Sequence, residues 1–246
     1  MTKSLSGKSA LVTGGTRGIG AATVRRLATD GAAAAFTYAT SDQKAAALVA
    51  EIEADGGQAL AIKADSADPE AVQHAVAETA SRFGQLDILV NNAGILLRGP
   101  VDGFSLADFD RMLAVNVRAV FVAVQAAVAH MGAGGRIITI GSVTADRSAF
   151  PGASVYSMTK AAVAALTRGM ARDLGSRGIT VNTVQPGPTE TDMNRDENTR
   201  AMLRPMLALG RIGTDTEIAS LVAYLASPEA SFVTGAALTI DGGYLS

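Results

Sequence analysis

Residues 13–20 constrain the fold of this chain more than any other segment. They read TGGTRGIG, with glycines in the spacing G-x3-G-x-G, and they join a short apolar run to an amphipathic stretch. Glycine lets the backbone approach a pyrophosphate, and the helix that follows directs unpaired N–H groups and a positive dipole end at that charge. The motif therefore predicts a phosphate-binding turn, with a tight turn that binds no ligand as the alternative. The turn residues expected to contact a dinucleotide are Gly14, Thr16, Arg17, Gly18, Ile19 and Gly20.

Short apolar runs alternate with helical patterns along the whole chain. The expected strands are 9–12, 32–38, 59–63, 88–91, 137–142, 180–185 and 237–240. The expected helices are 19–29, 43–55, 69–83, 106–131, 155–176 and 216–226. The strands read as continuous apolar runs, which predicts a parallel sheet with helices on both faces. We expect one α/β domain over residues 1–246, with a substrate loop at about 186–213 that could act as a lid.

Composition excludes several classes of function. The net charge of −2 gives no basic footprint for nucleic acid, and the chain has no cysteine for a disulfide or a thiolate metal site. The two histidines, His74 and His130, lie far apart, so no metal site is expected. The amino terminus lacks the apolar core of a signal peptide, and the apolar stretch 119–131 is too short to span a bilayer. The default expectation is a cytoplasmic protein without membrane or nucleic-acid partners.

The end of the second expected strand bears on which dinucleotide is bound. An acidic residue there would bind the ribose 2′-hydroxyl of NAD and repel the 2′-phosphate of NADP. Thr40 and Ser41 stand there instead, and Asp42 comes after the expected position. Arg17 in the glycine turn could hold a phosphate, although it could also be a solvated surface residue. The sequence favours NADP(H) over NAD(H).

A tyrosine and a lysine offer acid/base chemistry. Tyr156 and Lys160 are four residues apart on an expected helix and share one face. A neighbouring ammonium should lower the tyrosine pKa from about 10 towards neutrality, while desolvation opposes part of that shift. Ser142 could hydrogen-bond a substrate oxygen beside them. Taken singly, these residues and Asn116 could be a surface pair, a helix cap and a buried amide.

The residues named so far, with two further motifs, occur in an order that resembles the classical short-chain dehydrogenases/reductases. The ordered set is residues 13–20, Asn91-Asn92-Ala93-Gly94, Asn116, Ser142, Tyr156-x-x-x-Lys160 and Pro186-Gly187, and the likeness runs from Gly7 to Gly243. The resemblance implies a single Rossmann-like domain with a seven-stranded parallel sheet, a nicotinamide cofactor and a homotetramer. Within this family, the chain resembles the 3-oxoacyl-carrier-protein reductase-like carbonyl reductases.

The resemblance also implies roles for individual residues. Asp65, with Ser66 beside it, would contact the adenine, and Asn116 would hold a water. Tyr156 and Lys160 would also touch the nicotinamide ribose. The adenosine ribose and the nicotinamide end would be contacted by Asn92, Ala93, Gly94, Pro186, Gly187, Thr189 and Thr191. The chain departs from the family pattern at Ser66, at Gln185 and in the fourteen-residue step from Ser142 to Tyr156.

The expected reaction is reversible hydride transfer between NADPH and the carbonyl carbon of a small ketone or aldehyde. Tyr156 would donate the proton, Ser142 would orient the carbonyl oxygen, and Lys160 would lower the Tyr156 pKa. Asn116 would link Lys160 to solvent through a water. Three alternatives stay open: an NAD-dependent alcohol or polyol dehydrogenase, a 3-oxoacyl-carrier-protein reductase, and a non-catalytic NADP-binding regulator.

The substrate pocket and the oligomer are more weakly encoded. Apolar walls for the pocket are expected from Phe150, Met193, Leu203 and Met206. The stretches 106–131 and 155–174 carry wide apolar faces with small residues, which suggests helix packing between subunits and a dimer of dimers.

Overall fold

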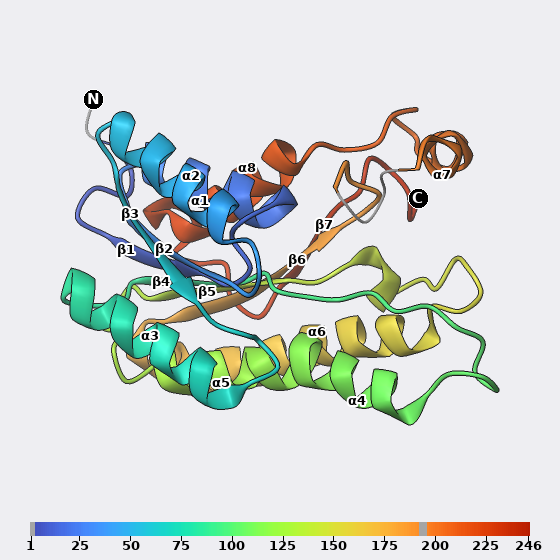
Figure 1. Cartoon of the computed structure of the whole chain (residues 1–246), viewed down its shortest axis with the longest axis horizontal. Helices are drawn as coiled ribbons and strands as arrows, with labels where there is room; N and C mark the ends of the chain where they lie inside the picture. The colour runs from blue at the N-terminus through green and yellow to red at the C-terminus, as the bar shows by residue number, and fades with distance from the viewer. Residues whose placement is uncertain (1–2, 192–195) are drawn as a thin grey trace.

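A seven-stranded parallel sheet forms the centre of the computed structural model, which describes residues 3–191 and 196–246 (Figure 1). Its strand order is β3-β2-β1-β4-β5-β6-β7. The strands are β1 (Ser9–Val12), β2 (Ala33–Tyr38), β3 (Gln58–Lys63), β4 (Ile88–Asn91), β5 (Arg136–Ile140), β6 (Thr180–Pro186) and β7 (Ala237–Ile240). The predicted α/β class is therefore confirmed.

Helices cover both faces of the sheet. α1 (Gly18–Thr29), α2 (Asp42–Ala54) and α8 (Asp215–Ala226) lie on one face, and α3 (Pro69–Phe83), α4 (Leu106–Leu113), α5 (Ala119–Ala127) and α6 (Ser154–Leu174) lie on the other (Figure 1). Alternate residues of β1 point into the two hydrophobic cores, one on each face of the sheet. Ala10 and Val12 pack with Leu27 of α1, whereas Leu11 packs with Val124 of α5. This alternation explains why a doubly covered strand reads as a continuous apolar run.

The winding of the chain reverses on either side of β1, which pairs with β2 and with β4. Val12 is in register with Phe36 on one side and with Val90 on the other. The residues that follow these parallel strands therefore lie together at the carboxyl ends of the strands. In open α/β sheets, ligands bind in the crevice at this point, outside the carboxyl ends of the strands.

The predicted uninterrupted helix over 106–131 is wrong in two respects, because the structure interrupts it and ends it at Ala127. α4 ends at Leu113, a π-helical turn spans Ala114–Arg118, and α5 then runs to Ala127. A π turn inserts one residue into the helical repeat and shifts which side chains face the core, and such turns are frequent at functional sites. Asn116 lies in the middle of this turn and is 2% exposed.

The predicted substrate loop carries short helical pieces on an apolar base. α7 (Glu197–Leu203) is followed by a 3-10 turn at Arg204–Met206. Leu203, Leu207 and Ile212 pack with Val143 and Tyr244 in a third, smaller core. Phe150 and Met206 pack against the same core, whereas Met193 lies outside the described residues. A lid motion of this segment stays a prediction.

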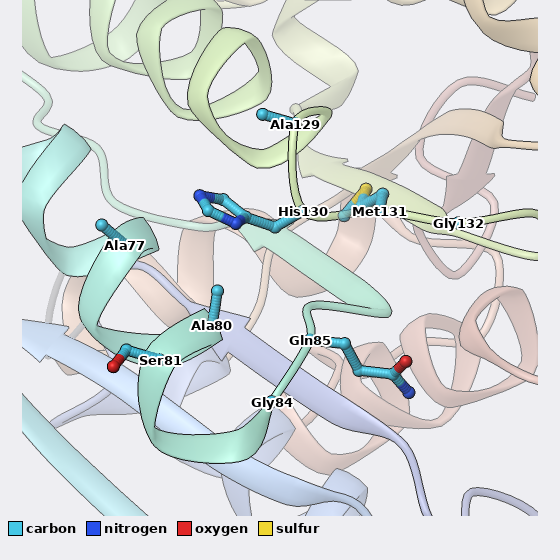
Figure 2. Close-up of a pocket in the computed structure, with 9 residues that line it drawn as sticks. All are labelled: Ala77, Ala80, Ser81, Gly84, Gln85, Ala129, His130, Met131 and Gly132. Atoms are coloured by element: carbon cyan, nitrogen blue, oxygen red, sulfur yellow. The ribbon is translucent and has the colours of Figure 1, made fainter.

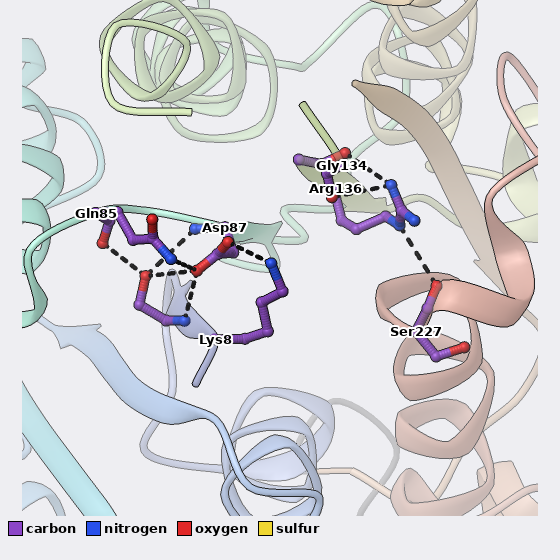
Figure 3. Close-up of polar contacts among 8 residues, drawn as sticks. Lys8, Gln85, Asp87, Gly134, Arg136 and Ser227 are labelled. Atoms are coloured by element: carbon purple, nitrogen blue, oxygen red, sulfur yellow. Dashed lines mark hydrogen bonds and ion pairs between the residues drawn. The ribbon is translucent and has the colours of Figure 1, made fainter. Parts of the chain in front are cut away.

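Polar contacts connect the chain segments at the amino ends of the strands (Figure 3). Asp87 accepts hydrogen bonds from Lys8 at 2.8 Å and from the Ser9 backbone at 2.9 Å. Arg136 is 7% exposed and donates to the carbonyl oxygens of Gly134 at 3.0 Å and Ser227 at 3.4 Å. Burial lowers the pKa of its guanidinium. These contacts fix the strand ends opposite the crevice.

Within residues 3–191 and 196–246, no helix has the length and apolar character needed to cross a membrane. In the same ranges, no three His, Cys, Asp or Glu side chains converge on a point that could hold a metal ion.

Candidate active site

The glycine turn joins β1 to α1 and is pinned to β2. Gly14 and Gly18 have φ values of +69° and +49°, a region that favours glycine. The Gly14 N–H donates to the Thr37 hydroxyl at 3.0 Å, and the Gly15 N–H donates to the Thr37 carbonyl at 2.9 Å. The turn is therefore held in one conformation at the carboxyl end of β1.

Two glycines of the turn are required by close packing. A Cβ at Gly15 would overlap the Phe36 side chain, and one at Gly20 would overlap the Gly14 carbonyl and lie 2.6 Å from the Asn92 amide nitrogen. α1 therefore starts directly beneath the turn. The first turn of α1 carries no acidic residue, and Arg17 at its N-cap makes no side-chain capping bond. This backbone leaves room and N–H donors for a pyrophosphate.

Asn92 braces the turn from β4. Its side-chain NH2 donates to the carbonyls of Thr13 and Gly14, both at 2.9 Å. The Thr13 hydroxyl in turn accepts from the backbone N–H groups of Asn92 and Ala93, both at 3.0 Å. The amide nitrogen of Asn92 is thus used within the protein, so its amide oxygen is the side-chain atom left for the predicted ribose contact.

The adenosine side of the crevice contains the other predicted residues. Thr40 and Asp65 are exposed, and Ser41 precedes α2 without capping it. Lys63 binds the Asp42 carboxylate at 3.1 Å and holds its pKa below the ordinary value. The nearest acid is therefore engaged by a cation. Thr16 and Ile19 of the turn are half-buried, and Arg17 is exposed.

A small cavity of about 10 Å³ lies beneath this side. Its lining includes Thr13, Ser66, Ala93 and Asn91, and the buried side-chain oxygen of Asn91 has no hydrogen-bond partner in the described structure. A cavity of this size holds about one water molecule. The orphaned oxygen marks this rim as a place where a polar partner is expected.

The two residues predicted for acid/base chemistry lie together on α6. The Lys160 Nζ is 5.7 Å from the centroid of the Tyr156 ring and donates to the Ile140 carbonyl, at the end of β5, at 2.8 Å. Burial lowers the pKa of the Lys160 ammonium to about 8. Burial also raises the pKa of the Tyr156 phenol to about 12, while a hydrogen bond from Ser142 and the charge of Arg98 lower it.

The predicted shift of the Tyr156 pKa towards neutrality is therefore wrong for the chain described here. Desolvation of the phenolate outweighs the groups that stabilise it. The Lys160 ammonium makes its hydrogen bond to the Ile140 carbonyl and faces the ring of Tyr156. At neutral pH the phenol consequently carries its proton, which is the form required of a proton donor.

Ser142 follows β5 and faces the same space. Its oxygen accepts from the Thr144 N–H at 3.2 Å and from the Thr144 hydroxyl at 2.9 Å, so it also caps the short helix at Val143–Ala145. A hydroxyl has one donor and two acceptor sites. With its acceptor sites filled by Thr144, Ser142 can act only as a donor, here towards Tyr156 and in a complex towards a substrate oxygen.

Asn116 connects the π turn to the loop after β4. Its oxygen accepts from the Ile95 N–H at 2.9 Å, and its nitrogen donates to the Ile95 carbonyl at 2.9 Å and to the Thr159 hydroxyl at 3.1 Å. A Cβ at Gly94 would lie 3.5 Å from this oxygen and 3.6 Å from the Lys160 Nζ. Gly94 therefore lets the loop pass close to both polar groups. That Asn116 binds a water molecule stays a prediction.

The predicted nicotinamide end follows β6. The Gly187 N–H donates to the Ile240 carbonyl at 3.0 Å, and a Cβ at Gly187 would lie 2.6 Å from that of Asp241. The Thr189 hydroxyl donates to the Gly187 carbonyl at 2.9 Å. Thr191 returns to the glycine turn, because a Cβ at Gly18 would lie 3.4 Å from its methyl group. The segment from Pro186 thus borders the same crevice.

Three residues at the site were not predicted from the sequence. Thr13 braces the turn, Thr159 links Asn116 to α6, and Arg98 acts electrostatically on Tyr156. Thr13 opens the TGG motif and Thr159 precedes Lys160, so their positions offered a signal. Arg98 lies in an irregular loop whose path the sequence does not indicate.

Figure 2 shows a surface hollow elsewhere on the molecule, between the end of α3 and the chain that follows α5. Ala77, Gln85 and His130 are among its lining residues. Leu86 N–H donates to the His130 carbonyl there, near the amino end of β4. None of the predicted site residues lines this hollow, so it is separate from the crevice.

Comparison with known proteins shows similarity over nearly the whole chain. A family model described as enoyl-(acyl carrier protein) reductase matches residues 14–245. The chain is 46% identical over 240 residues to the cyclic-di-GMP-binding biofilm dispersal mediator protein of Escherichia coli (strain K12), covering 97% of this chain and 98% of that protein. It is 42% identical over 241 residues to 3-oxoacyl-[acyl-carrier-protein] reductase FabG of Staphylococcus aureus (strain Mu50 / ATCC 700699), covering 96% and 97%.

A solved structure agrees in fold over the full length. The short chain dehydrogenase from Burkholderia cenocepacia J2315, solved in complex with NADP, superposes with a TM-score of 0.96 at 53% identity and covers 99% of this chain and 100% of that one. The order of motifs, the sheet and these relatives lead to one conclusion: the chain belongs to the classical short-chain dehydrogenase/reductase family of oxidoreductases.

Proposed function

We propose that this protein is an NADPH-dependent reductase that converts a ketone or aldehyde carbonyl to an alcohol, with Tyr156 as the proton donor. The proposal is carried by one observation: Ser142, just after the carboxyl end of β5, lies close to Tyr156 and Lys160 in the first two turns of α6. These residues lie beside the glycine turn. Arrangement of a donor, an orienting hydroxyl and a cation at one point suits charge that develops on a carbonyl oxygen.

The crevice fits a dinucleotide on features of this chain. The glycine turn leaves space that a Cβ would fill, and the start of α1 offers N–H donors without a side-chain cap. Arg17, Thr40 and Ser41 offer positive charge and hydroxyl donors near a 2′-phosphate, while Asp42 is bound by Lys63. The Burkholderia relative was solved with NADP. When bound, NADPH supplies the hydride that reduces the carbonyl carbon.

The residues proposed to hold it are those of the turn together with the rims of the crevice. They are Gly14, Thr16, Arg17, Gly18, Ile19, Gly20, Thr40, Ser41, Asp65, Ser66, Asn92, Ala93, Gly94, Tyr156, Lys160, Pro186, Gly187, Thr189 and Thr191.

Tyr156 and Ser142 act on the substrate oxygen. The Tyr156 phenol is protonated at neutral pH because burial disfavours the phenolate, so it can donate to the alkoxide that develops during reduction. The Ser142 hydroxyl has its acceptor sites filled by Thr144 and can donate to the same oxygen. Two donors aimed at one oxygen stabilise the charge that forms there.

Lys160 and Asn116 support proton return. Once Tyr156 has donated, the Lys160 ammonium near its ring stabilises the phenolate until a proton is regained. Asn116 holds the Ile95 backbone against the Thr159 position next to Lys160, and its oxygen keeps one lone pair for a water that would connect Lys160 to solvent.

A second candidate is a 3-oxoacyl-carrier-protein reductase, which the 42% identity to the Staphylococcus aureus enzyme favours. Carrier proteins are acidic, so a basic docking surface would be needed. Residues 119–135 contain no lysine or arginine, while Arg168 and Arg172 of α6 are exposed. This thin basic strip is why small free carbonyl compounds are preferred as the proposed substrates.

The testing experiment is an NADPH-consumption screen over ketones, diketones, ketoesters and acyl thioesters, repeated with NADH. We expect turnover of at least one carbonyl class and a kcat/KM ratio that favours NADPH about tenfold or more, because one phosphate ion pair is worth on the order of 1.4 kcal/mol. A tenfold preference for NADH would contradict the cofactor assignment. Tight NADPH binding without any turnover would contradict the assignment as a reductase.

A further inference from the structure

The backbone on both sides of Arg98 contacts residues next to the candidate active site. Three residues before it, both backbone polar groups of Ile95 are bound by the Asn116 amide at 2.9 Å. One residue after it, the Gly99 N–H donates to the Gly152 carbonyl at 3.1 Å. Gly152 has a φ of +78°, and a Cβ there would lie 3.3 Å from the Gly99 nitrogen. The segment carrying Arg98 therefore spans from Asn116 to the approach of α6.

The side chain of Arg98 acts on the reacting group. Its positive charge lowers the pKa of the Tyr156 phenol, which places the guanidinium within electrostatic reach of the proton donor. Tyr156 lies in the first turn of α6, four residues beyond Gly152, so the backbone contact and the electrostatic effect locate Arg98 in the same place.

The guanidinium has no anionic partner in the described chain. Some other exposed arginines are paired with carboxylates, such as Arg25 with Glu51 at 2.7 Å and Arg211 with Glu217 at 2.6 Å. Arg147, near the same opening, donates to the Tyr244 carbonyl at 3.1 Å and lies over its ring. Among residues 3–191 and 196–246, no carboxylate lies within 4.0 Å of Arg98. Its five N–H donors are thus available to a ligand.

We propose that Arg98 recognises an anionic group of the substrate, so that the preferred substrates are carbonyl compounds bearing a carboxylate or a phosphate. This inference rests on the proposed reductase function. A guanidinium presents paired donors that match the two oxygens of either anion. The anion has two sources: the carboxylate of a free oxo acid, or the phosphate of a carrier that delivers an oxoacyl thioester.

The test compares anionic and neutral substrates that share one carbonyl. One arm uses acetoacetate against methyl acetoacetate. The other uses acetoacetyl-coenzyme A against the N-acetylcysteamine thioester of acetoacetate. The wild type, Arg98→Gln, Arg98→Lys and the control Arg82→Gln are assayed with NADPH. Arg82 is exposed at the far end of α3 and tests for a general effect of losing one positive charge.

The expected result is a loss of about tenfold in the anionic-to-neutral ratio of kcat/KM for Arg98→Gln in one arm, as for the loss of one charge-assisted contact. Arg98→Lys should keep part of the ratio, and Arg82→Gln should keep all of it. The ratio cancels any change in the Tyr156 pKa, because both substrates share that proton donor. The arm that responds identifies the source of the anion.

Other outcomes overturn the inference at different levels. An unchanged ratio in both arms, or a wild type that prefers neutral substrates, removes the role of Arg98 and leaves the reductase function intact. Absence of turnover by the wild type with every substrate, in this test and in the wider screen, overturns the proposed function and this inference together. Should Arg98→Gln fail to fold, the Lys variant and the wild-type ratio still decide.

Discussion

Lys160 shows at the scale of one residue how the site is set electrostatically. It is 5% exposed and donates to the Ile140 carbonyl, a neutral acceptor, and burial lowers its pKa to about 8. Exposed pairs such as Lys63 with Asp42 contribute little to stability, because solvent screens both charges. Burial of the Lys160 ammonium instead lowers the stability of the fold. That a destabilising charge is kept at this position is consistent with a catalytic role.

Lys160→Met should remove a pH dependence of stability. Folding lowers the Lys160 pKa from 10.5 to about 8, so the unfolded chain binds the proton more tightly between these values. The free energy of unfolding of the wild type should therefore rise with pH, by roughly 2–3 kcal/mol between pH 7 and pH 10, from this residue. The variant should lack that rise in urea titrations over the same range. Tyr156, whose pKa is raised, acts in the opposite direction only above its ordinary value of 10.0. Parallel curves for the two proteins would contradict the account.

The chemistry of the site was readable from residue types, whereas its bracing was not. Tyr156 and Lys160 share a helix face, so their proximity follows from local spacing. The bonds from Asn92 to Thr13 and Gly14 join residues almost eighty positions apart, and they depend on the register of β1 and β4. The Tyr156 pKa was predicted with the wrong direction because the extent of burial is a property of the folded site.

At the scale of secondary-structure elements, tight contact between β1 and α1 shapes the cofactor turn. The turn is closed by Gly20 beneath Gly14 and by Asn92 at its side. The sequence patterns predicted most of these elements, because the doubly covered strands read as short continuous apolar runs and the helices as longer amphipathic stretches. The π turn at Asn116 was missed, since one inserted residue leaves an apolar helical stretch looking continuous.

Gly20→Ala should damage this element, with Gly132→Ala as the matched control. A methyl group at Gly20 meets backbone and the Asn92 amide, whereas a Cβ at Gly132 meets nothing within 4 Å. We expect a loss of about 1–3 kcal/mol in the free energy of unfolding and weaker NADPH binding for Gly20→Ala. The control should stay within about 1 kcal/mol of the wild type. Urea unfolding and a fluorescence titration with NADPH measure both, and wild-type values for Gly20→Ala would refute the packing argument.

At the scale of the whole molecule, the amino ends and the carboxyl ends of the strands have different roles. The amino ends are fixed by contacts such as Lys8 with Asp87 and by the buried Arg136 (Figure 3). The carboxyl ends collect the glycine turn, Ser142 and Tyr156. The polar groups that stabilise the fold are thus separated by the length of the strands from the polar groups that are proposed to bind a ligand.

The homotetramer expected from the family resemblance would bury apolar side chains that one chain leaves exposed. Phe121 of α5 is 47% exposed and Met158 of α6 is 40% exposed, while Phe232 before β7 is fully exposed. Apolar side chains of this size favour burial between subunits. Light scattering should give a mass of about 100 kDa, four times the 25.0 kDa chain. Phe121→Asp should lower that mass, and a wild type near 25.0 kDa at micromolar concentration would contradict the proposal.

The most direct test of the central claim is the turnover of Tyr156→Phe with NADPH and the best carbonyl substrate of the wild type. The substitution removes the proton donor and keeps the ring beside Lys160. We predict a fall in kcat of about 10²–10⁴-fold, the range for loss of general acid catalysis. NADPH binding should stay within about threefold of the wild type, because Tyr156→Phe removes at most one of the proposed cofactor contacts and leaves the glycine turn unchanged. Turnover close to that of the wild type, with NADPH bound, would contradict the assignment of Tyr156 as the proton donor.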